Sequence, residues 1–209
     1  MLTSFVTLRC MARLSTLDDL AAGQQGYFTR AQARLHGVDD ASLHRASDHA
    51  RLLIVDRGVY RFASAPEHPH EQIFATWMSL SPRRATWERA MNPDALVFGR
   101  SALAVYGVGD LVERWREFAV PTVRRSRNSA VAFRRRSWGP NDWVVVEGMT
   151  VARIEWVFVE AIRSGEEPGH LADVLTDARR LGLLNEADLQ ARLSTVGRSS
   201  ARIGRALLA

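Results

Sequence analysis

The sequence predicts an α+β protein in which three short helices and a two-stranded hairpin precede a mixed α/β region with a helical tail. Three observations lead to this prediction. Short amphipathic segments and a hairpin pattern fill residues 14–65. Strand-like apolar runs such as "DALVFG" and "REFAVP" follow from about residue 94, and apolar residues recur at helical spacing from about Arg153 onward. The stretch "ASAPEHPH" (63–70) has the composition of a linker between the two regions.

The first two helices are expected on either side of a glycine. The segment "TLDDLAAGQQ" (16–25) places its leucines on one face, and "GYFTRAQARLHG" (26–37) follows it. Thr29 and Gln32 have the spacing of a capping box, in which each side chain bonds an amide near the other residue. Gly37 fits the end of the second helix.

A third helix and a hairpin complete the N-terminal region. Asp39 or Asp40 is the expected N-cap of a helix that runs to about His49. The next segment, "RLLIVDRGVYRF" (51–62), has two β-prone runs around turn residues, and Gly58 suits the left-handed position of a short loop. Three helices followed by such a hairpin are the element order of a winged helix-turn-helix, so we predict this fold for residues 14–65.

Composition favours a nucleic-acid partner. The chain has 209 residues, 46% of them hydrophobic, which is enough for one or two packed domains. It carries 28 Arg, no Lys and a net charge of +5, with a pI near 10.5. Guanidinium groups suit bidentate contacts with phosphate or guanine. The absence of Lys also fits the codon bias of a GC-rich genome.

Cysteine usage and hydropathy predict a cytoplasmic protein without a membrane partner. A single cysteine, Cys10, excludes a disulfide framework and a cysteine-rich zinc site. The N-terminal stretch has no charged region ahead of its short apolar run, so we do not interpret it as a signal peptide. Met11 is a second candidate for the biological start, and no apolar run reaches membrane-spanning length.

The third helix and the hairpin together predict a DNA-facing surface. A narrow helix fits the major groove, and a hairpin beside it can reach phosphate or the minor groove. The candidate base-reading residues are Ser42, His44 and Arg45. The candidate phosphate contacts are Thr29, Arg30, Arg51, Arg57 and Arg61. The alternative is a protein-docking module, because residues 1–65 hold eight Arg against six Asp, and Asp39 and Asp48 would repel phosphate.

The second region, residues 71–209, is expected to form a separate C-terminal domain. A helix is predicted from Glu71, with apolar side chains at helical spacing in "EQIFATWMSL". The runs "SAVAFRRR" and "NDWVVVEG" are expected to be strands, and "RSALAVYG" a small-residue helix. The tryptophans, chiefly Trp77, Trp143 and Trp156, are expected in the core.

Six arginines form a possible second basic patch. The segment "TVRRSRNSAVAFRRR" (122–136) has a turn-like centre, so a hairpin with arginines on both arms is expected. These arginines are Arg124, Arg125, Arg127, Arg134, Arg135 and Arg136. They would extend a DNA footprint or meet an acidic protein or an RNA. The alternative is a charged strand edge that discourages aggregation.

No catalytic, cofactor-binding or metal-binding constellation is evident in the sequence. The acidic residues of the helical tail are expected in solvent, since Glu155 and Glu160 differ by five positions and do not share a helix face. The six histidines show no metal-ligand spacing, and His68 and His70 in the linker are expected to be exposed. We therefore expect no cofactor and do not favour an enzyme.

A family resemblance supports the DNA-binding interpretation. The segment "GYFTRAQARLHGVDDASLHRASDHARLLIVDRGVYRF" resembles the N-terminal domain of the AbiEi family of bacterial antitoxins and transcriptional regulators. The features that match are "FTRAQA", the "GV" before the third helix, the late "RL" and "RGVYR" on the wing. The later "VFGRSALAVYGVGDL" and "REFAVP" are similar more loosely, so the resemblance covers about residues 14–150.

The resemblance implies an antitoxin with two domains. A winged domain would bind double-stranded operator DNA and repress the antitoxin's own operon, while a C-terminal domain would neutralise a cognate nucleotidyltransferase-like toxin. A monomer or weak dimer is expected. Three alternatives stay open: a nuclease, disfavoured by the absence of lysine, an atypical serine kinase that phosphorylates the toxin, and a regulator without an antitoxin role. Neither a P-loop nor a kinase lysine is present to support the kinase.

Overall fold

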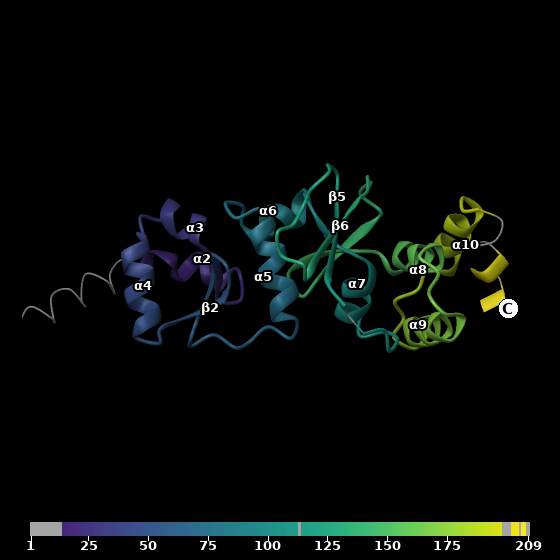
Figure 1. The fold of residues 1–209 in the computed structure, drawn as a ribbon, viewed down its shortest axis with the longest axis horizontal. Helices are drawn as coiled ribbons and strands as arrows, with labels where there is room; N and C mark the ends of the chain where they lie inside the picture. Colours follow the sequence, from purple (N-terminus) through teal and green to yellow (C-terminus); the bar gives the residue numbers. More distant parts are fainter. Residues whose placement is uncertain (1–13, 113, 198–201, 205, 208–209) are drawn as a thin grey trace, which may run out of the picture. The chain divides into compact units, whose positions relative to one another are not determined.

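The computed structural model describes residues 14–112, 114–197, 202–204 and 206–207, and its chain divides into two compact units (Figure 1). The first unit is Met1–Asp94 and the second is Ala95–Ala209. Both contain helices and a sheet, which confirms the predicted α+β class. Cys10 and the alternative start at Met11 lie outside the described residues.

The first unit is a winged helix-turn-helix extended by two further helices. Its sheet has the antiparallel order β1-β3-β2. The elements are η1 (Ser15–Leu17), α2 (Asp18–Ala22), β1 (Tyr27–Thr29), α3 (Arg30–Leu35), α4 (Asp40–Asp48), β2 (Leu52–Asp56), β3 (Val59–Phe62), α5 (Glu71–Leu80) and α6 (Thr86–Met91). The three predicted helices and the hairpin are therefore present in the predicted order.

The segment predicted as the second helix begins as a strand. Tyr27 pairs with Arg61, Phe28 with Tyr60 and Thr29 with Val59, so β1 adds a third strand to the hairpin. All three β1 residues are buried, and aromatic side chains fit such a pleated surface well. The helix then starts at Arg30, after the Thr29–Gln32 capping box that the sequence predicted.

Apolar faces of the short helices meet over this sheet. Phe28 lies at the centre of the core, with its ring stacked against Tyr60 at a centroid distance of 5.7 Å. Leu43 and Ala46, on the inner face of α4, belong to the same cluster, as does Leu52 at the start of β2. Burial of these side chains fixes which face of α4 remains exposed.

Helix α5 belongs to the first unit rather than to the second. Its first residue, Glu71, accepts hydrogen bonds from the hydroxyl of Tyr27 at 2.6 Å and from Nε of Arg61 at 2.9 Å. Phe74 meets the ring of Tyr27 edge-on at 5.1 Å. The boundary between the compact units consequently falls between Asp94 and Ala95, later in the chain than the linker-like segment on which the sequence-based boundary was placed.

That segment is partly buried, contrary to expectation. His68 is almost completely buried, with its ring stacked on Phe74 at 4.5 Å. Its backbone N–H donates to the hydroxyl of Tyr27 at 2.9 Å, while His70 is half-buried. The prediction that both histidines are exposed was wrong, because the segment packs onto the aromatic side chains of β1 and α5.

The second unit contains a five-stranded mixed sheet with the order β6-β5-β4-β8-β7. Parallel pairing joins β6 to β5 and β4 to β8, and the other neighbours are antiparallel. The elements are β4 (Leu96–Val97), α7 (Gly99–Tyr106), β5 (Arg116–Val120), β6 (Val131–Arg135), β7 (Trp143–Val146), β8 (Met149–Ala152), α8 (Ile154–Arg163), α9 (Pro168–Arg180) and α10 (Glu186–Ser194).

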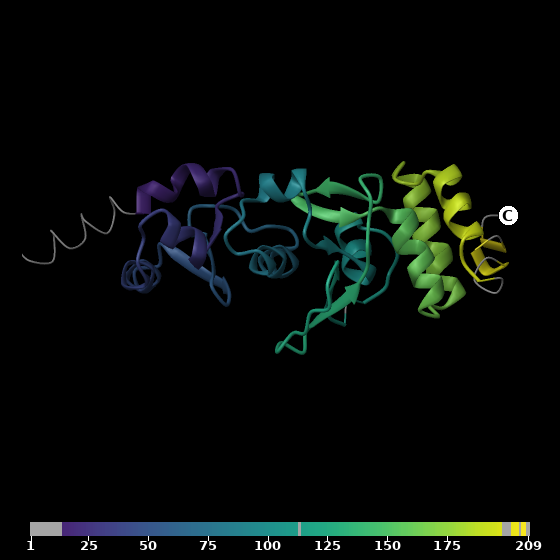
Figure 2. The same cartoon turned by 90° about the horizontal axis from the view of Figure 1, so that it is seen from above.

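The helical tail forms one layer of the second unit, in which α8 contacts both α9 and α10 (Figure 2). Glu155 of α8 is 1% exposed, and its Oε1 accepts a hydrogen bond of 2.6 Å from the backbone N–H of Asn185, the N-cap of α10. Glu160 is also largely covered and pairs with Arg136. The expectation that these two acids are in solvent was wrong, because neighbouring segments cover them.

Of the three tryptophans expected in the core, Trp77 is fully buried, whereas Trp143 and Trp156 are half-buried. Among the described residues, no helix combines the length and the apolar character needed to cross a membrane.

Candidate nucleic-acid interface

Helix α4 presents a polar face to solvent. Asp39 caps it by accepting a hydrogen bond of 2.8 Å from the backbone N–H of Ser42. Because Leu43 and Ala46 face the core, His44 and Arg45 lie on the outer side. Asp48 also lies on the outer face, one turn beyond His44, and its carboxylate is 2.8 Å from Nδ1 of that residue.

The hairpin carries an arginine at its tip. Strands β2 and β3 are joined by Arg57 and Gly58, and Gly58 has a φ of +75°, as predicted for this loop. The carbonyl oxygen of Gly58 accepts a hydrogen bond of 2.8 Å from the backbone N–H of Arg30. The tip is thus tied to the start of α3, while the side chain of Arg57 is exposed.

Three guanidinium groups line a cleft between α3 and this tip. The cleft has a volume of about 230 Å³, and Arg30, Arg34 and Arg57 contribute its cationic lining. Asp40, the first residue of α4, bonds two of them: Nε of Arg30 lies 2.7 Å from Oδ1, and Nη2 of Arg34 lies 2.6 Å from Oδ2. Hydrogen bonds from Arg30, and then from Arg34, hold the pKa of Asp40 well below its usual range.

The arrangement of polar helix, arginine-tipped wing and short preceding helix can be compared with known proteins. Residues 15–63 match the family model described as "Transcriptional regulator, AbiEi antitoxin". The resemblance of this segment to the AbiEi family is confirmed.

Among the solved structures that resemble this chain, one shares its fold over most of the length. It is the crystal structure of the RV2827C protein from Mycobacterium tuberculosis, with a TM-score of 0.58 and 16% sequence identity. The similarity covers 94% of this chain and 76% of that one, and at this identity it concerns the fold. No curated protein matches the sequence significantly.

Three residues predicted to contact DNA are buried within the AbiEi-type domain. The Thr29 hydroxyl accepts from the N–H of Gln32 and donates to the carbonyl of Pro82, so it caps α3 and does not face solvent. Ser42 is fully buried on the inner face of α4. Arg61 is covered and bonds Glu71. The structure places these three side chains inside the fold and not on the solvent-exposed surface, so they are not carried into the proposed contact set.

The other predicted contact residues remain accessible. His44, Arg45 and Arg57 are exposed, and Arg51 is half-exposed where α4 leads into β2. The side chain of Arg30 is 50% exposed, although it is paired with Asp40. Arg34 was not among the predicted contacts. The sequence feature that could have indicated it is its spacing of four residues from Arg30, which places both side chains on one side of α3.

The arginine-rich segment of the second unit is not the predicted hairpin. Strand β6 runs parallel to β5, with Arg116 beside Val131 and Val120 beside Arg135. Residues 121–130 therefore carry the chain back from the end of β5 to the start of β6, the edge strand of the sheet. A parallel pair cannot be joined by a tight turn, and this return segment is exposed throughout except at its last residue. The tip projects from the unit in Figure 2.

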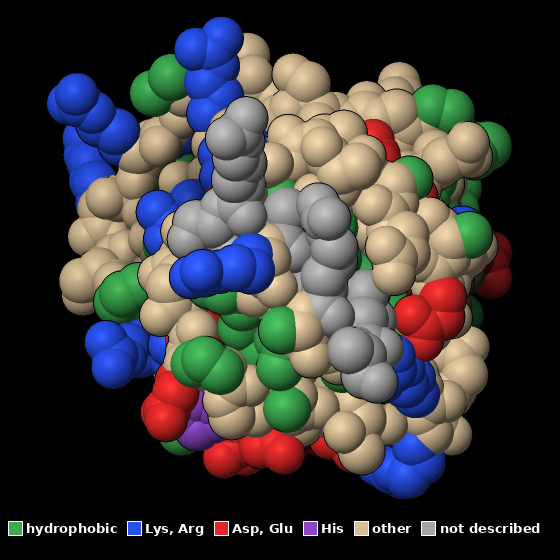
Figure 3. Space-filling view, turned by 90° about the vertical axis from the view of Figure 1, so that its right-hand side faces the viewer, with side chains coloured by type: hydrophobic (Ala, Val, Ile, Leu, Met, Phe, Trp, Pro, Cys, Tyr) green, Lys and Arg blue, Asp and Glu red, His purple; other side chains and the backbone are tan. Residues whose placement is uncertain are grey.

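Four arginines of this segment form a basic edge, defined as Arg124, Arg125, Arg127 and Arg135. All four are exposed, and Arg124 lies 5.6 Å from the ring centroid of Phe133. The remaining two of the predicted six pair with acids: Arg134 lies 3.4 Å from Glu117, and Arg136 bonds Glu160. The face drawn in Figure 3 shows both arginine and acidic side chains at its surface.

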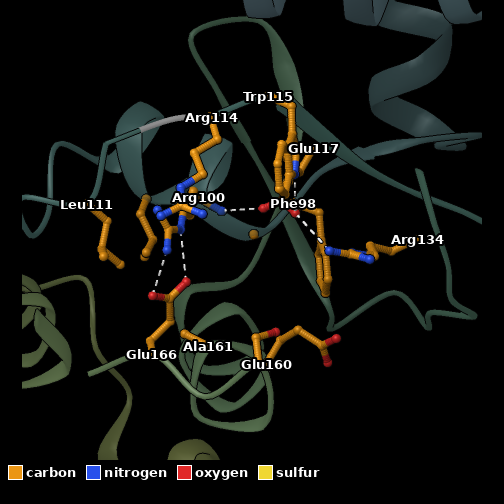
Figure 4. Close-up of a pocket in the computed structure, with 13 residues that line it drawn as sticks. Phe98, Arg100, Leu111, Arg114, Trp115, Glu117, Arg134, Glu160, Ala161 and Glu166 are labelled. Atoms are coloured by element: carbon orange, nitrogen blue, oxygen red, sulfur yellow. Dashed lines mark hydrogen bonds and ion pairs between the residues drawn. The ribbon is translucent and has the colours of Figure 1, made fainter. Parts of the chain in front are cut away.

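A charged pocket of about 210 Å³ lies beside α7 in the second unit (Figure 4). Arg100 forms two hydrogen bonds of 2.8 Å to the carboxylate of Glu166. Glu117 is buried, and its carboxylate accepts from the backbone N–H of Arg100 at 2.9 Å and from Nε1 of Trp115 at 3.0 Å. Glu117 therefore caps α7 from a neighbouring strand, a role that sequence spacing did not reveal.

One cluster outside the pocket has the residue types of a metal site. Asp110, His170 and Asp173 bring ligand atoms within 4.8 Å of one another, and Nδ1 of His170 lies 2.6 Å from Asp110. The sequence did not suggest this cluster, because Asp110 is far from the other two along the chain. Both carboxylates are exposed, and the observed contact is a hydrogen bond between a histidine ring nitrogen and a carboxylate at the surface.

Proposed function

We propose that the protein binds double-stranded operator DNA in its own promoter through α4 and the wing, and represses that operon. The observation that carries the proposal is that α4 exposes His44 and Arg45 while the hairpin exposes Arg57 at its tip, both within the segment that matches the AbiEi family model. A helix of this width fits the major groove, where base edges are distinguishable. Arg57 and the cleft arginines would meet phosphate.

Arg45 is the proposed principal base reader. It is exposed, and its Nη2 lies 3.2 Å from Oγ of Ser42, an anchor that leaves other guanidinium N–H groups for a ligand. A bidentate contact to guanine contributes about 1–3 kcal/mol of discrimination. His44 is the second reader, although Asp48 competes for its Nδ1.

For the second unit we propose antitoxin activity against a cognate nucleotidyltransferase-like toxin in the cytoplasm. The proposal rests on the AbiEi match of the first unit. The basic edge gives the second unit a surface suited to acidic groups of a toxin or to phosphate. We expect the protein to act as a monomer or a weak dimer, with this basic edge exposed to its partner.

Duplex binding tests the DNA proposal. Fluorescence anisotropy with the protein's own upstream DNA and a scrambled duplex, each at two salt concentrations, would report affinity and specificity. Arg45→Ala should reduce the preference for the upstream duplex, whereas Arg57→Ala should weaken binding of both duplexes alike and reduce the salt slope by about one.

Arg45→Lys and Arg57→Lys are the matched controls, because lysine keeps the positive charge but loses the bidentate geometry. Arg57→Lys should bind both duplexes with nearly the affinity of the wild type. Arg45→Lys should still show a reduced preference for the upstream duplex. If neither alanine variant alters either titration, the proposed surface is wrong.

Co-expression with the adjacent gene tests the antitoxin proposal. Growth rescue of cells that express a neighbouring nucleotidyltransferase supports it, and failure to rescue contradicts it. Incubating both purified proteins with γ-labelled ATP separates the kinase alternative: label on the toxin would favour phosphorylation, and rescue without label would favour neutralisation by another route.

A further inference from the structure

We propose that the cleft formed by Arg30, Arg34 and Arg57 is a phosphodiester-binding site in which the carboxylate of Asp40 acts as a competing internal ligand. This inference rests on the proposed DNA-binding function and deepens it. It assigns a ligand to the cleft and adds Arg34 to the phosphate contacts. It also gives Asp40 the role of a brake on affinity.

The geometry of the carboxylate is that of an anion held between two cations. Asp40 contacts Arg30 through both oxygens and Arg34 through both oxygens, with distances of 2.7 Å to Nε of Arg30 and 2.6 Å to Nη2 of Arg34. Guanidinium forks bind carboxylate and phosphate oxygens in the same planar manner. The position of the Asp40 carboxylate is therefore one that a phosphate oxygen pair can take.

The residues in and around the cleft carry more positive than negative charge. Three arginines line it, and Asp40, which is next to the cleft and not part of its lining, is the one carboxylate bonded to two of these arginines among the described residues. Asp56 lies near the tip, but it accepts from the backbone N–H of Arg57 and from the hydroxyl of Thr76 and does not bond the guanidinium. A monoanionic phosphodiester would balance part of this excess.

The exposure of the ion pairs makes replacement possible. The side chains of Arg30, Arg34 and Asp40 are 50%, 58% and 42% exposed. Exposed pairs of this kind contribute little to stability, so their exchange for a phosphate contact costs little. The carboxylate nevertheless remains next to any phosphate that enters, and its repulsion lowers affinity for every duplex equally.

A double-mutant cycle tests the brake. Asp40→Asn should tighten binding of the upstream and scrambled duplexes by the same factor, about two- to fivefold. Arg34→Ala should weaken binding more in the Asp40→Asn background than in the wild type, because the freed guanidinium then contributes fully. Asp48→Asn is the matched control: it removes the same charge from the same helix, and its effect should simply add to that of Arg34→Ala. Equal, additive gains from both asparagine variants would overturn the proposal.

Inorganic pyrophosphate distinguishes failure of the site from failure of the function. In ¹⁵N spectra of the full chain, pyrophosphate should shift the Nε–Hε signals of Arg30 and Arg34, with tighter binding in Asp40→Asn. Shifts without duplex binding would retain the anion site and reject the DNA function. Duplex binding with no such shifts and no coupling in the cycle would reject the anion site and retain the function.

Discussion

Several charged residues of this protein act inside the fold. Glu155 satisfies the N–H of Asn185 at the start of α10, and Glu117 satisfies the N–H of Arg100 in the first turn of α7. The first turn of a helix leaves amides without intrahelical partners, and a carboxylate from elsewhere in the fold can supply them. Such acids are indistinguishable from solvated ones in sequence, because their partners lie 17 or 30 positions away.

Glu155→Ala is expected to destabilise the second unit by about 1–3 kcal/mol, because it leaves a covered N–H without an acceptor. Glu155→Gln keeps an acceptor at Oε1 and replaces Oε2, which has no hydrogen-bond partner among the described residues. Urea unfolding of the full chain measures both variants. Equal losses for the two would show that charge, and not the hydrogen bond to Asn185, is what matters.

Tyr27 should make stability fall at alkaline pH. Burial, and then the hydrogen bond to Glu71, raise the pKa of Tyr27 to about 12, from 10.0 in the unfolded chain. Between these values the unfolded state loses a proton that the folded state keeps, so the free energy of unfolding decreases as pH rises through this window. Urea titrations across the window should give a shallower decrease for Tyr27→Phe. An identical decrease in that variant would contradict the assignment.

Helix α3 illustrates how a short element is held by its ends. Six residues are too few for a stable isolated helix. Thr29 and Gln32 close a capping box at its start, with the Thr29 N–H donating to Oε1 of Gln32 at 2.8 Å. The same threonine ends β1, so one residue joins the sheet to α3, the helix that precedes α4.

Thr29→Ala is expected to cost about 1–2 kcal/mol of stability in the first unit, through loss of the cap. Thr29→Ser keeps the hydroxyl and should stay close to the wild type. Neither variant should change the salt slope of duplex binding, because the hydroxyl is buried. A slope reduced by about one in Thr29→Ala would restore the original interpretation of Thr29 as a phosphate contact.

The whole molecule consists of two compact units whose boundary was not visible in composition. Proline and histidine made residues 63–70 resemble a linker, yet the covered Arg61 requires Glu71, and the hydroxyl of Tyr27 bonds both Glu71 and His68. Near the end of the first unit, Arg89 pairs with Asp94 at 2.8 Å.

A fragment of residues 14–94 is therefore expected to unfold cooperatively and to keep duplex binding. A fragment of residues 14–65 should fail to fold, since it lacks α5 and leaves Arg61 without its carboxylate partner. Near-ultraviolet circular dichroism and urea titration of both fragments check this expectation. A stably folded shorter fragment would place the boundary where composition suggested.

Local chemistry made the order of the elements of the first unit predictable from sequence. Caps at Thr29 and Asp39, the left-handed Gly58 and the amphipathic pattern of α4 act over a few neighbouring residues, so spacing reveals them. Burial and pairing between distant segments were decided by the fold: the strand at Tyr27, the parallel β6 and the carboxylates of Glu117 and Glu155. Asp40 combines the two levels, since its place at the start of α4 is local, whereas its position between Arg30 and Arg34 depends on how α3 packs against α4.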